Sequence, residues 1–492
     1  RSLGYTHSKT MNGSLGTPNN ATVLWELYKI TKDPTIIQFF AQQRAENPET
    51  LLPIDTKNLS AIGTQMQAII DQYGTEVDRK TGNFSQYGLS MFHQGSGATE
   101  RAFWFDSDTG SPHGHYDALS YGLYGYNTNL MVDLGYPPLN YPGSWSSDEC
   151  WWYKATPMHN TVSFNRDFNR FWYPGPNPFD QSTLAVNSEQ TLFADGKSFK
   201  AIGADGRAVV ANIGQNPRQY DRVVAMNNID EDSFYMFDVF RVNSDLVPYC
   251  MYQTGDATLT MDNDMTPLSG KGPFHEKWMI KNVESAANVT GNATATFQFN
   301  KTHLEKTGAD PNMNLFVNLT DLTSGSRNLY TMDKWFNYDL QTATAPAYLP
   351  GLAISVEKEG EFADVAFVNI VEPYDGNSKI KQINRLDITN ASGETKPDCD
   401  AAVEVALNNG RTDLIISNDV LDPINKKSAE DKTVSYVTDW DVRFDGELAM
   451  ISRSDNHISK IALTNAKSLS IGDYTINLVD DCDYIELEFD GD

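Results

Sequence analysis

Basic residues and long apolar runs are scarce in this chain of 492 residues. The chain has 38 Lys and Arg against 65 Asp and Glu, which gives a formal net charge of −27. Because phosphate recognition requires a basic surface, this balance argues against a nucleic-acid partner, and the acidity itself is explained by solubility. No window comes near the roughly 18 uninterrupted apolar residues that a membrane helix needs. We therefore expect neither nucleic acid nor membrane as a partner.

Cysteine is also rare. The four cysteines, Cys150, Cys250, Cys399 and Cys482, lie far apart and have no Cys-x-x-Cys spacing. They suggest no thiolate metal site, and the sequence leaves open whether they form disulfides. The chain begins at Arg1, without an initiator Met and without a basic-then-apolar signal segment. We expect from this that it is processed or is a fragment of a longer polypeptide.

Helical patterns occupy the first 75 or so residues. Apolar residues recur at helical spacing over 22–31 and 35–43, on either side of a Lys-Asp-Pro break at 32–34. Residues 60–74 show a third helical pattern, with Ser60 as the expected N-cap and Gly74 as the expected stop.

Short sequence patterns typical of β-strands follow Gly74. Short runs such as FYMFDVFRV and DVAFVNIV are separated by Gly, Asn, Asp and Pro, and no helices alternate with them, which favours antiparallel sheets. A softer boundary falls near residues 374–400. The pattern therefore predicts an α+β, mainly β chain: a helical segment over 1–77, a large antiparallel β-sandwich over 78–375 and a smaller C-terminal β domain over 376–492.

The residues best suited to catalysis or metal binding lie between Phe92 and Asn169. Four of the eight histidines fall within this block: His93, His113, His115 and His159. His113, His115 and Asp117 alternate, so on a strand their side chains would leave the same face. Histidines and carboxylates drawn from separate strands of one sheet would suit a divalent cation such as zinc. Each His could instead be an ordinary surface or core residue, and Asp117 could orient a ligand or bind backbone groups.

Four pieces of this block occur in an order that resembles the β-sandwich signature of the heparinase II/III-like polysaccharide lyases. They are HGHYDALS from His113, the apolar run MVDLGY with its Asp-x-Gly, Tyr141, and the His-Asn-Thr of MHNTVSF. The resemblance is strong over about 85–170 and weak elsewhere. It implies an (α/α) toroid, a central antiparallel β-sandwich and a C-terminal β domain, so that residues 1–77 would be the end of a toroid. It also implies a secreted or periplasmic enzyme.

The resemblance assigns roles to individual residues. His115, Asp133 and His159 match metal-ligand positions, usually of zinc, and the metal would organise the site rather than contact substrate. His113 and Tyr141 match catalytic positions that face the substrate cleft. Three further residues of the region are candidates for substrate binding: His93, Arg101 and Trp145.

Lyases of this kind cleave uronate-containing polysaccharides by β-elimination. A base removes the C5 proton, an acid reaches the leaving oxygen, and the charge of the neighbouring carboxylate must be neutralised, tasks that His and Tyr suit. Alginate is the first substrate that we expect and a glycosaminoglycan the second. The family's toroid supplies further catalytic groups from helices upstream of this chain, so a separate N-terminal toroid chain or segment is an expected partner.

Two other functions stay open. Cupin-type metalloenzymes also place His-x-His, a following carboxylate and a distant His on an antiparallel barrel, with Asp117 as the carboxylate here. A non-catalytic carbohydrate-binding or structural protein could retain the metal-stabilised sandwich. Formation of an unsaturated product from a glycan would separate the lyase from both.

Overall fold

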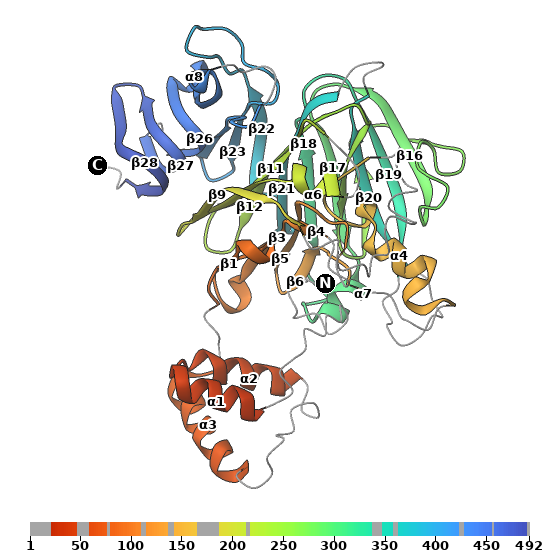
Figure 1. Ribbon diagram of the computed structural model, residues 1–492, viewed down its shortest axis with the longest axis vertical. Coiled ribbons are helices and arrows are strands. Elements are labelled where there is room, and N and C mark those ends of the chain that lie inside the picture. Colours follow the sequence, from red (N-terminus) through yellow and green to blue (C-terminus); the bar gives the residue numbers. More distant parts are fainter. Residues whose placement is uncertain are drawn as a thin grey trace.

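The computed structural model describes most of the chain. The described residues are 21–46, 59–75, 79–109, 115–135, 142–164, 186–212, 217–336, 347–357, 363–422, 428–454 and 457–489. Strands dominate, and every strand pair in this part of the chain is antiparallel, so the expected α+β, mainly β class is confirmed. Figure 1 shows β-sheets above a separate lobe of three helices.

The three helices of the lobe are α1 (Ala21–Thr31), α2 (Thr35–Glu46) and α3 (Leu59–Tyr73). The Asp33 carboxylate accepts from the backbone N–H of Thr35 at 2.9 Å. This hydrogen bond satisfies a backbone donor in the first turn of α2, so Asp33 stabilises the start of that helix. Gly74 has φ +77° and ends α3 as expected. Ser60 lies inside the first turn of α3, so its prediction as the N-cap is wrong. Four buried apolar side chains form the lobe's core: Trp25, Ile37, Met66 and Ile69.

A five-stranded sheet follows the lobe, in the order β1-β2-β3-β5-β6. Its strands are β1 (Gly82–Phe84), β2 (Leu89–Gln94), β3 (Arg101–Asp106), β5 (Ser120–Gly125) and β6 (Thr128–Met131). Every residue of β3 and β5 is buried, because both faces of the sheet are covered. Gly122 in β5 permits this, since a Cβ there would lie 1.8 Å from the ring of Trp104.

Two larger sheets form the sandwich. The eight-stranded sheet has the order β14 (Ala257–Met261), β17 (Ala293–Phe299), β18 (Leu315–Asp321), β21 (Ala363–Asp375), β12 (Phe234–Ser244), β11 (Gln219–Asn228), β10 (Phe199–Asp205) and β9 (Glu189–Asp195). The six-stranded sheet has the order β15 (Thr266–Pro267), β16 (Ile280–Val289), β19 (Arg327–Phe336), β20 (Ala347–Ser355), β13 (Pro248–Gln253) and β7 (Val162–Phe164). Apolar side chains of both sheets and of the five-stranded sheet share one core. A short pair, β4 (Asp108–Thr109) and β8 (Val186–Asn187), lies outside these sheets.

The C-terminal sheet has seven strands. It runs β22 (Ile380–Leu386), β23 (Ala401–Leu407), β24 (Arg411–Ser417), β26 (Val442–Ser454), β27 (His457–Ile471) and β28 (Tyr474–Glu488), with β25 (Val434–Val437) paired to β26. Buried residues alternate: Ile415 and Met450 pack on the eight-stranded sheet, whereas Leu414 and Ile451 face a second core. The acidic C-terminal end belongs to β28 as far as Glu488.

Short helices connect the strands. They are α4 (Asp148–Lys154), α6 (Arg207–Asn212), α7 (Lys301–Thr307) and α8 (Ala429–Thr433), with 3-10 turns η1 (Ser85–Tyr87), η2 (Gly97–Thr99), η3 (Ser144–Ser146), η4 (Thr156–Met158) and η6 (Thr438–Trp440). None of the described helices combines the length and the apolar character needed to cross a membrane. Among the described side chains, Cys150, Cys250 and Cys399 are buried and form no disulfide. The three domain ranges given above stay a prediction.

Candidate metal centre and its surroundings

Four buried side chains converge beside the five-stranded sheet: His115, Asp117, Asp133 and His159. One potential ligand atom from each lies within 4.8 Å of the others. His159 Nδ1 and Asp133 Oδ1 are 3.2 Å apart, and the rings of His115 and His159 have centroids 5.2 Å apart. Asp117, whose role the sequence left open, belongs to this cluster together with the three expected ligands.

The four residues come from loops rather than from strands. His115 and Asp117 precede β5, Asp133 follows β6, and His159 lies between η4 and β7. The expected strand through Asp117 is wrong, because the chain turns there: Ser120 N–H donates to Asp117 O at 2.8 Å, and Leu119 has φ +59°. The expectation of ligands from one sheet is also wrong, since β7 belongs to the six-stranded sheet. An ion held here would join two sheets.

The two residues after His159 fasten this loop to the one that carries His115. Asn160 Nδ2 donates to Tyr121 O at 3.0 Å, and its Oδ1 accepts from the backbone N–H of Gln253 at 2.7 Å. Thr161 Oγ1 donates to Ala118 O at 2.6 Å. The His-Asn-Thr sequence therefore supplies one candidate ligand and two buried side chains that position the neighbouring segments.

A buried ion pair reinforces the same loops. Arg222 Nε and Nη2 donate to the two carboxylate oxygens of Asp238 at 2.8 and 2.6 Å, and Nη1 donates to the carbonyls of Leu119 and Asn160. Both side chains are fully buried. Because the pair is bidentate and both Nη1 donors also have acceptors, much of its desolvation is compensated. The carbonyl contact fixes Leu119 in its left-handed conformation.

A second buried pair, Gln253 and Lys334, holds the segments just before two of the candidate ligands. Gln253 Nε2 donates to Val132 O and Met158 O, each immediately ahead of a ligand in sequence. Lys334 Nζ donates to Pro157 O at 2.7 Å and to Gln253 Oε1 at 3.2 Å. Burial lowers the pKa of Lys334 to about 7. We call these two side chains the Gln253–Lys334 clamp.

The donor atoms of the cluster fit a divalent cation. The two oxygens of Asp133 and the two ring nitrogens of His159 are buried, and within the described residues none makes a well-aligned hydrogen bond. Ligand atoms about 2.0–2.1 Å from a tetrahedral ion lie roughly 3.3 Å apart, close to the 3.2 Å observed between His159 Nδ1 and Asp133 Oδ1. Burial lowers the pKa of His159, but the charges of Asp133 and Asp117 outweigh this and raise it overall.

His93 and Arg101 lie elsewhere. His93 pairs with Ala102 in the register of β2 and β3, and Ala102 pairs with Tyr124, whereas the cluster borders the Ser120 end of β5. Four residues of strand correspond to roughly 13 Å, so the two groups occupy opposite ends of the sheet. Burial lowers the pKa of His93 to about 4, so the ring is neutral near pH 7. Arg101 is buried, and its donors bind the backbone carbonyls of residues 99, 230 and 231 and the Asn228 side chain.

Three expected site residues cannot be placed. His113 and Tyr141 lie outside the described residues, and so does the side chain of Trp145, whose backbone belongs to η3. Their catalytic and substrate-binding roles, like those of His93 and Arg101, stay predictions. The Gln253–Lys334 clamp and the Arg222–Asp238 pair were missed by sequence reasoning, because nothing local marks residues so far along the chain from the cluster.

A family comparison agrees with the resemblance seen in the sequence. Residues 101–200 match the family model "Heparinase II/III-like, C-terminal". This segment contains all four members of the cluster, so the family resemblance is confirmed for the region that builds the candidate metal centre. No curated protein matches the chain.

Solved structures of heparinases are also similar to this chain. A heparinase III with methylated lysines is 13% identical over 76% of this chain and 45% of its own, with a TM-score of 0.46. A heparan sulfate lyase from Pedobacter heparinus is 15% identical over 80% of this chain and 49% of its own, with a TM-score of 0.40. This chain therefore spans less than half of the length of these structures, and the similarity is too low to support an argument about activity.

Proposed function

We propose, from the heparinase II/III-like character of residues 101–200, that this chain is the β-sheet part of a polysaccharide lyase acting on an acidic, uronate-containing glycan. The observation that carries the proposal is the convergence of His115, Asp133 and His159 into one buried cluster within the matched region. Residues expected from a sequence signature and far apart along the chain thus meet in a site with suitable chemistry.

The substrate class follows from the matched family. The family model carries the name of heparinases, so a glycosaminoglycan is the first candidate and alginate, our expectation from the sequence, becomes the second. We favour the lyase over the cupin-type alternative, because the matched family model is that of the heparinases and because Asp133, which has no role in the cupin pattern, belongs to the cluster. An extracytoplasmic location and a toroid segment as partner belong to this proposal.

Within this function the cluster would have an organising role. A divalent cation, zinc by its donor set, would supply positive charge and join the three segments that carry His115 with Asp117, Asp133, and His159. His113 is proposed to reach the substrate from the residues just before His115, and Tyr141 from the residues after Asp133. The clamp and the Arg222–Asp238 pair would keep these three segments in place.

Ultraviolet absorbance of the unsaturated uronate product tests the proposal. We expect zinc-loaded protein to produce this absorbance from one of heparin, heparan sulfate, chondroitin, hyaluronan, ulvan or alginate. Replacement His113→Ala should reduce the rate by about 100-fold or more, the usual contribution of a general acid or base. The control His457→Ala changes an exposed residue of β27 and should leave the rate unchanged.

The opposite results are equally informative. Folded, metal-loaded protein that binds one of these glycans without releasing product would point to a requirement for the toroid segment or to the non-catalytic alternative. Equal rates for wild type and His113→Ala would exclude the assigned role of His113.

A further inference from the structure

A cavity of about 380 Å³ lies between the sandwich and the C-terminal sheet. Turns of three hairpins contribute to it: Gln94–Thr99 between β2 and β3, Lys197 and Ser198 between β9 and β10, and Asn228–Glu231 between β11 and β12. Arg411 of β24 and Lys460 of β27 close the other side. Its volume falls within the range of ligand sites, about 300–1,000 Å³.

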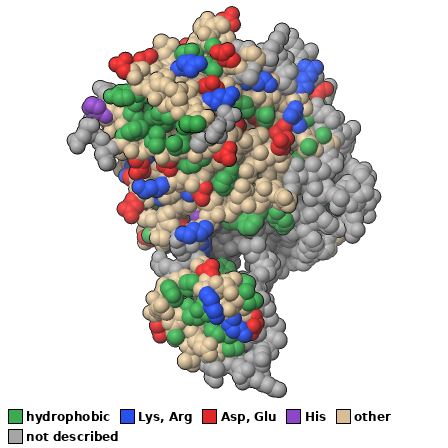
Figure 2. All heavy atoms as spheres, turned by 60° about the vertical axis from the view of Figure 1, so that its left-hand side comes forward, with side chains coloured by type: hydrophobic (Ala, Val, Ile, Leu, Met, Phe, Trp, Pro, Cys, Tyr) green, Lys and Arg blue, Asp and Glu red, His purple; other side chains and the backbone are tan. Residues whose placement is uncertain are grey.

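Basic side chains are concentrated around this cavity, which we call the junction cavity. Its lining includes four cations, Arg101, Lys197, Arg411 and Lys460, against two carboxylates, Asp230 and Glu231. The whole chain has the opposite balance, with 38 basic and 65 acidic residues. Figure 2 shows basic side chains scattered singly among acidic ones over one face of the molecule.

Arg101 contributes a fixed positive charge at the cavity wall. Its guanidinium donates to the carbonyl oxygens of Thr99 and Glu231 at 3.2 and 2.7 Å and to Asn228 Oδ1 at 3.0 Å. These acceptors are neutral, and no carboxylate of the described chain lies within ion-pair distance. The hydrogen bonds therefore hold the cation in place, and the charges of Asp230, Glu231 and Asp232 act on it without forming an ion pair.

Lys460 is the second cation of interest, because its ammonium makes neither a hydrogen bond nor an ion pair with the described residues. The register of the C-terminal sheet places it opposite Ser452, which in turn pairs with Asp413. Arg411 lies two positions before Asp413 and so projects from the same face of the sheet. Burial and the nearby positive charge of Arg411 lower the pKa of Lys460, and the charges of Asp413, Glu486 and Glu488 offset this only in part.

The carboxylates near these cations already accept hydrogen bonds, and two of them, Asp413 and Glu488, accept from the lining cations Arg411 and Lys197. Asp230 accepts from Ser233 Oγ and from the N–H groups of Asp232 and Ser233. Glu486 accepts from Lys197 N, Ser198 N and Ser198 Oγ. Asp413 accepts from Arg411 at 2.9 Å, and Glu488 accepts from the exposed Lys197 ammonium at 3.2 Å. Lys460 is thus left with free donors in a cavity whose lining cations outnumber its carboxylates.

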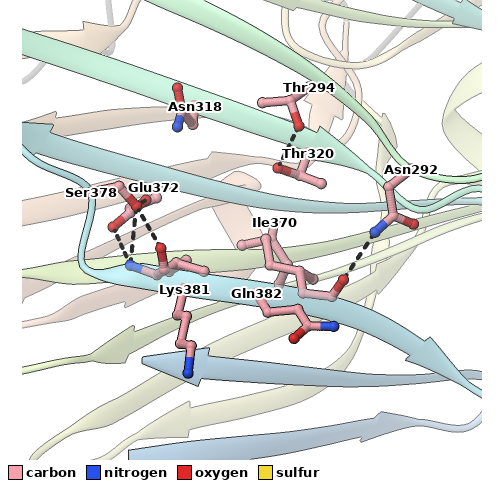
Figure 3. Close-up of a pocket in the computed structure, with 11 residues that line it drawn as sticks. Asn292, Thr294, Asn318, Thr320, Ile370, Glu372, Ser378, Lys381 and Gln382 are labelled. Atoms are coloured by element: carbon pink, nitrogen blue, oxygen red, sulfur yellow. Dashed lines mark hydrogen bonds between the residues drawn. The ribbon is translucent and has the colours of Figure 1, made fainter. Parts of the chain in front are cut away.

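A second cavity differs from the junction cavity, because its polar side chains form hydrogen bonds with neighbouring protein groups. It has a volume of about 240 Å³ and lies between β17, β18, β21 and β22 (Figure 3). Its polar groups pair with one another: Thr294 with Thr320, Asn292 Nδ2 with Ile383 O, and Glu372 with Ser378. Lys381 extends away from Glu372. Apart from Lys381, these polar groups therefore already have partners within the protein, unlike Lys460 in the junction cavity.

We propose that the junction cavity binds a sulfate or carboxylate substituent of an acidic glycan, as an accessory site at the opposite end of the five-stranded sheet from the candidate metal centre. The glycan as ligand rests on the proposed function, whereas the anion preference rests on the cations alone. An anion there would accept from Lys460 Nζ and, in place of Glu488, from Lys197 Nζ, beside the guanidinium of Arg101 and the Arg411–Asp413 ion pair. It would hold a chain without taking part in its cleavage.

Binding of a fluorescent, sulfated heparin tetrasaccharide to the full chain in the His113→Ala background tests this site without turnover. We expect Lys460→Gln and Lys197→Gln each to weaken binding on the order of five- to tenfold and to reduce its salt dependence. The matched control Lys467→Gln removes an exposed lysine of the same strand, β27, and should have no effect. Circular dichroism should show all variants folded.

Three results would overturn the proposal. They are unchanged affinity in the Lys460→Gln, Lys197→Gln double variant, an equal loss in Lys467→Gln, and inorganic sulfate competing as tightly as the tetrasaccharide, which would mean a site for the free ion. The proposed function is tested separately by the absorbance of the product. Binding that depends on Lys460 without any product would support the anion site and count against lyase activity of this chain alone. Product without such binding would support the lyase and reject the anion site.

Discussion

At the scale of single residues, the candidate metal centre depends on side chains that donate no ligand atom. Gln253 holds the carbonyls of Val132 and Met158, and these residues immediately precede Asp133 and His159. A small shift of either carbonyl would move a ligand. We therefore regard Gln253 as a positioning residue.

Replacement Gln253→Leu should lower the affinity for Zn²⁺ or Co²⁺ by about 10- to 100-fold, the usual effect of losing a group that orients metal ligands. It should also lower the free energy of unfolding of the metal-free protein by about 1–3 kcal/mol, because buried polar groups lose their partner. Chelator competition and thermal melts with and without metal measure the two effects separately.

A matched control comes from another buried glutamine. Gln219 Nε2 donates to Asp221 and Asp419, both at 2.8 Å, beside the C-terminal sheet. Gln219→Leu should destabilise the fold but leave the metal affinity unchanged. Equal metal affinities for Gln253→Leu and wild type would show that Gln253 only fills space.

Residues of the cluster could be predicted from the sequence to the extent that they lie in short motifs. His115, Asp133 and His159 were expected together, and the structure brings them together. Gln253 and Lys334 could not be predicted, because their partners lie 95 and 177 residues away and no spacing rule spans such distances. Which residues such side chains contact is decided by sheet pairing and not by neighbours in sequence.

At the scale of secondary-structure elements, α7 is joined to β6 through one neutral histidine. His303 Nδ1 accepts from the backbone N–H of Asp256 at 3.3 Å, so Nε2 carries the proton and donates to Asn129 O at 3.1 Å. The approach is close enough to require Gly255, because a Cβ there would lie 2.2 Å from the imidazole ring. Protonation of Nδ1 would break the first of these hydrogen bonds.

Acidic pH should therefore weaken the contact by which His303 joins α7 to β6. Burial lowers the pKa of His303 to about 4, below its ordinary value of 6.5, so between these pH values the unfolded chain binds more protons than the folded one. The contribution of His303 to the free energy of unfolding is fully present above pH 6.5. It is lost as the pH falls toward 4, by up to about 1.4 kcal/mol per pH unit. His93 acts in the same direction.

Urea unfolding at pH 7 and pH 4.5 measures this loss. His303→Gln should be less stable than wild type at pH 7 but should lose less stability on acidification. The exposed His457→Gln should behave like wild type. An unchanged pH dependence in His303→Gln would show that His303 does not titrate in this range.

Helices and strands could be predicted where the sequence pattern that defines them is local. The Lys-Asp-Pro break and Gly74 marked helix ends that the structure has, because a helix end is settled within one turn, whereas Ser60 lies inside α3 and not at its N-cap. The segment from His115 to Leu119 misled, since alternation of side chains is equally compatible with a loop whose turn is fixed by the distant Arg222. Antiparallel pairing was predicted, but the placement of β7 in a sheet other than that of β5 and β6 depends on contacts that no periodicity reports.

At the scale of the whole molecule, the helical lobe has its own small core. Four buried apolar side chains, Trp25, Ile37, Met66 and Ile69, pack among the three helices, and Figures 1 and 2 show the lobe standing apart from the β-sheets. A core of this size supports little independent stability. The β-sheets, by contrast, share large continuous cores.

Deletion of residues 1–78 should therefore leave the midpoint of thermal unfolding and the metal affinity of the β part unchanged within error. The isolated segment 1–78 should show little cooperative unfolding by circular dichroism. A truncated protein that aggregates or melts at a clearly lower temperature would show that the lobe stabilises the sheets. Titration with Co²⁺ provides the second readout.

The long sequence separation of the Gln253–Lys334 clamp from the loops that it holds has a consequence for biosynthesis. The candidate ligands emerge from the ribosome before the clamp is complete, because Lys334 follows its partner Pro157 by 177 residues. At about 5–20 residues per second, this interval corresponds to roughly 10–35 seconds of translation. During that time a nascent chain exposes histidines and carboxylates that nothing yet constrains, so tight ion capture is expected to be one of the last events of its maturation.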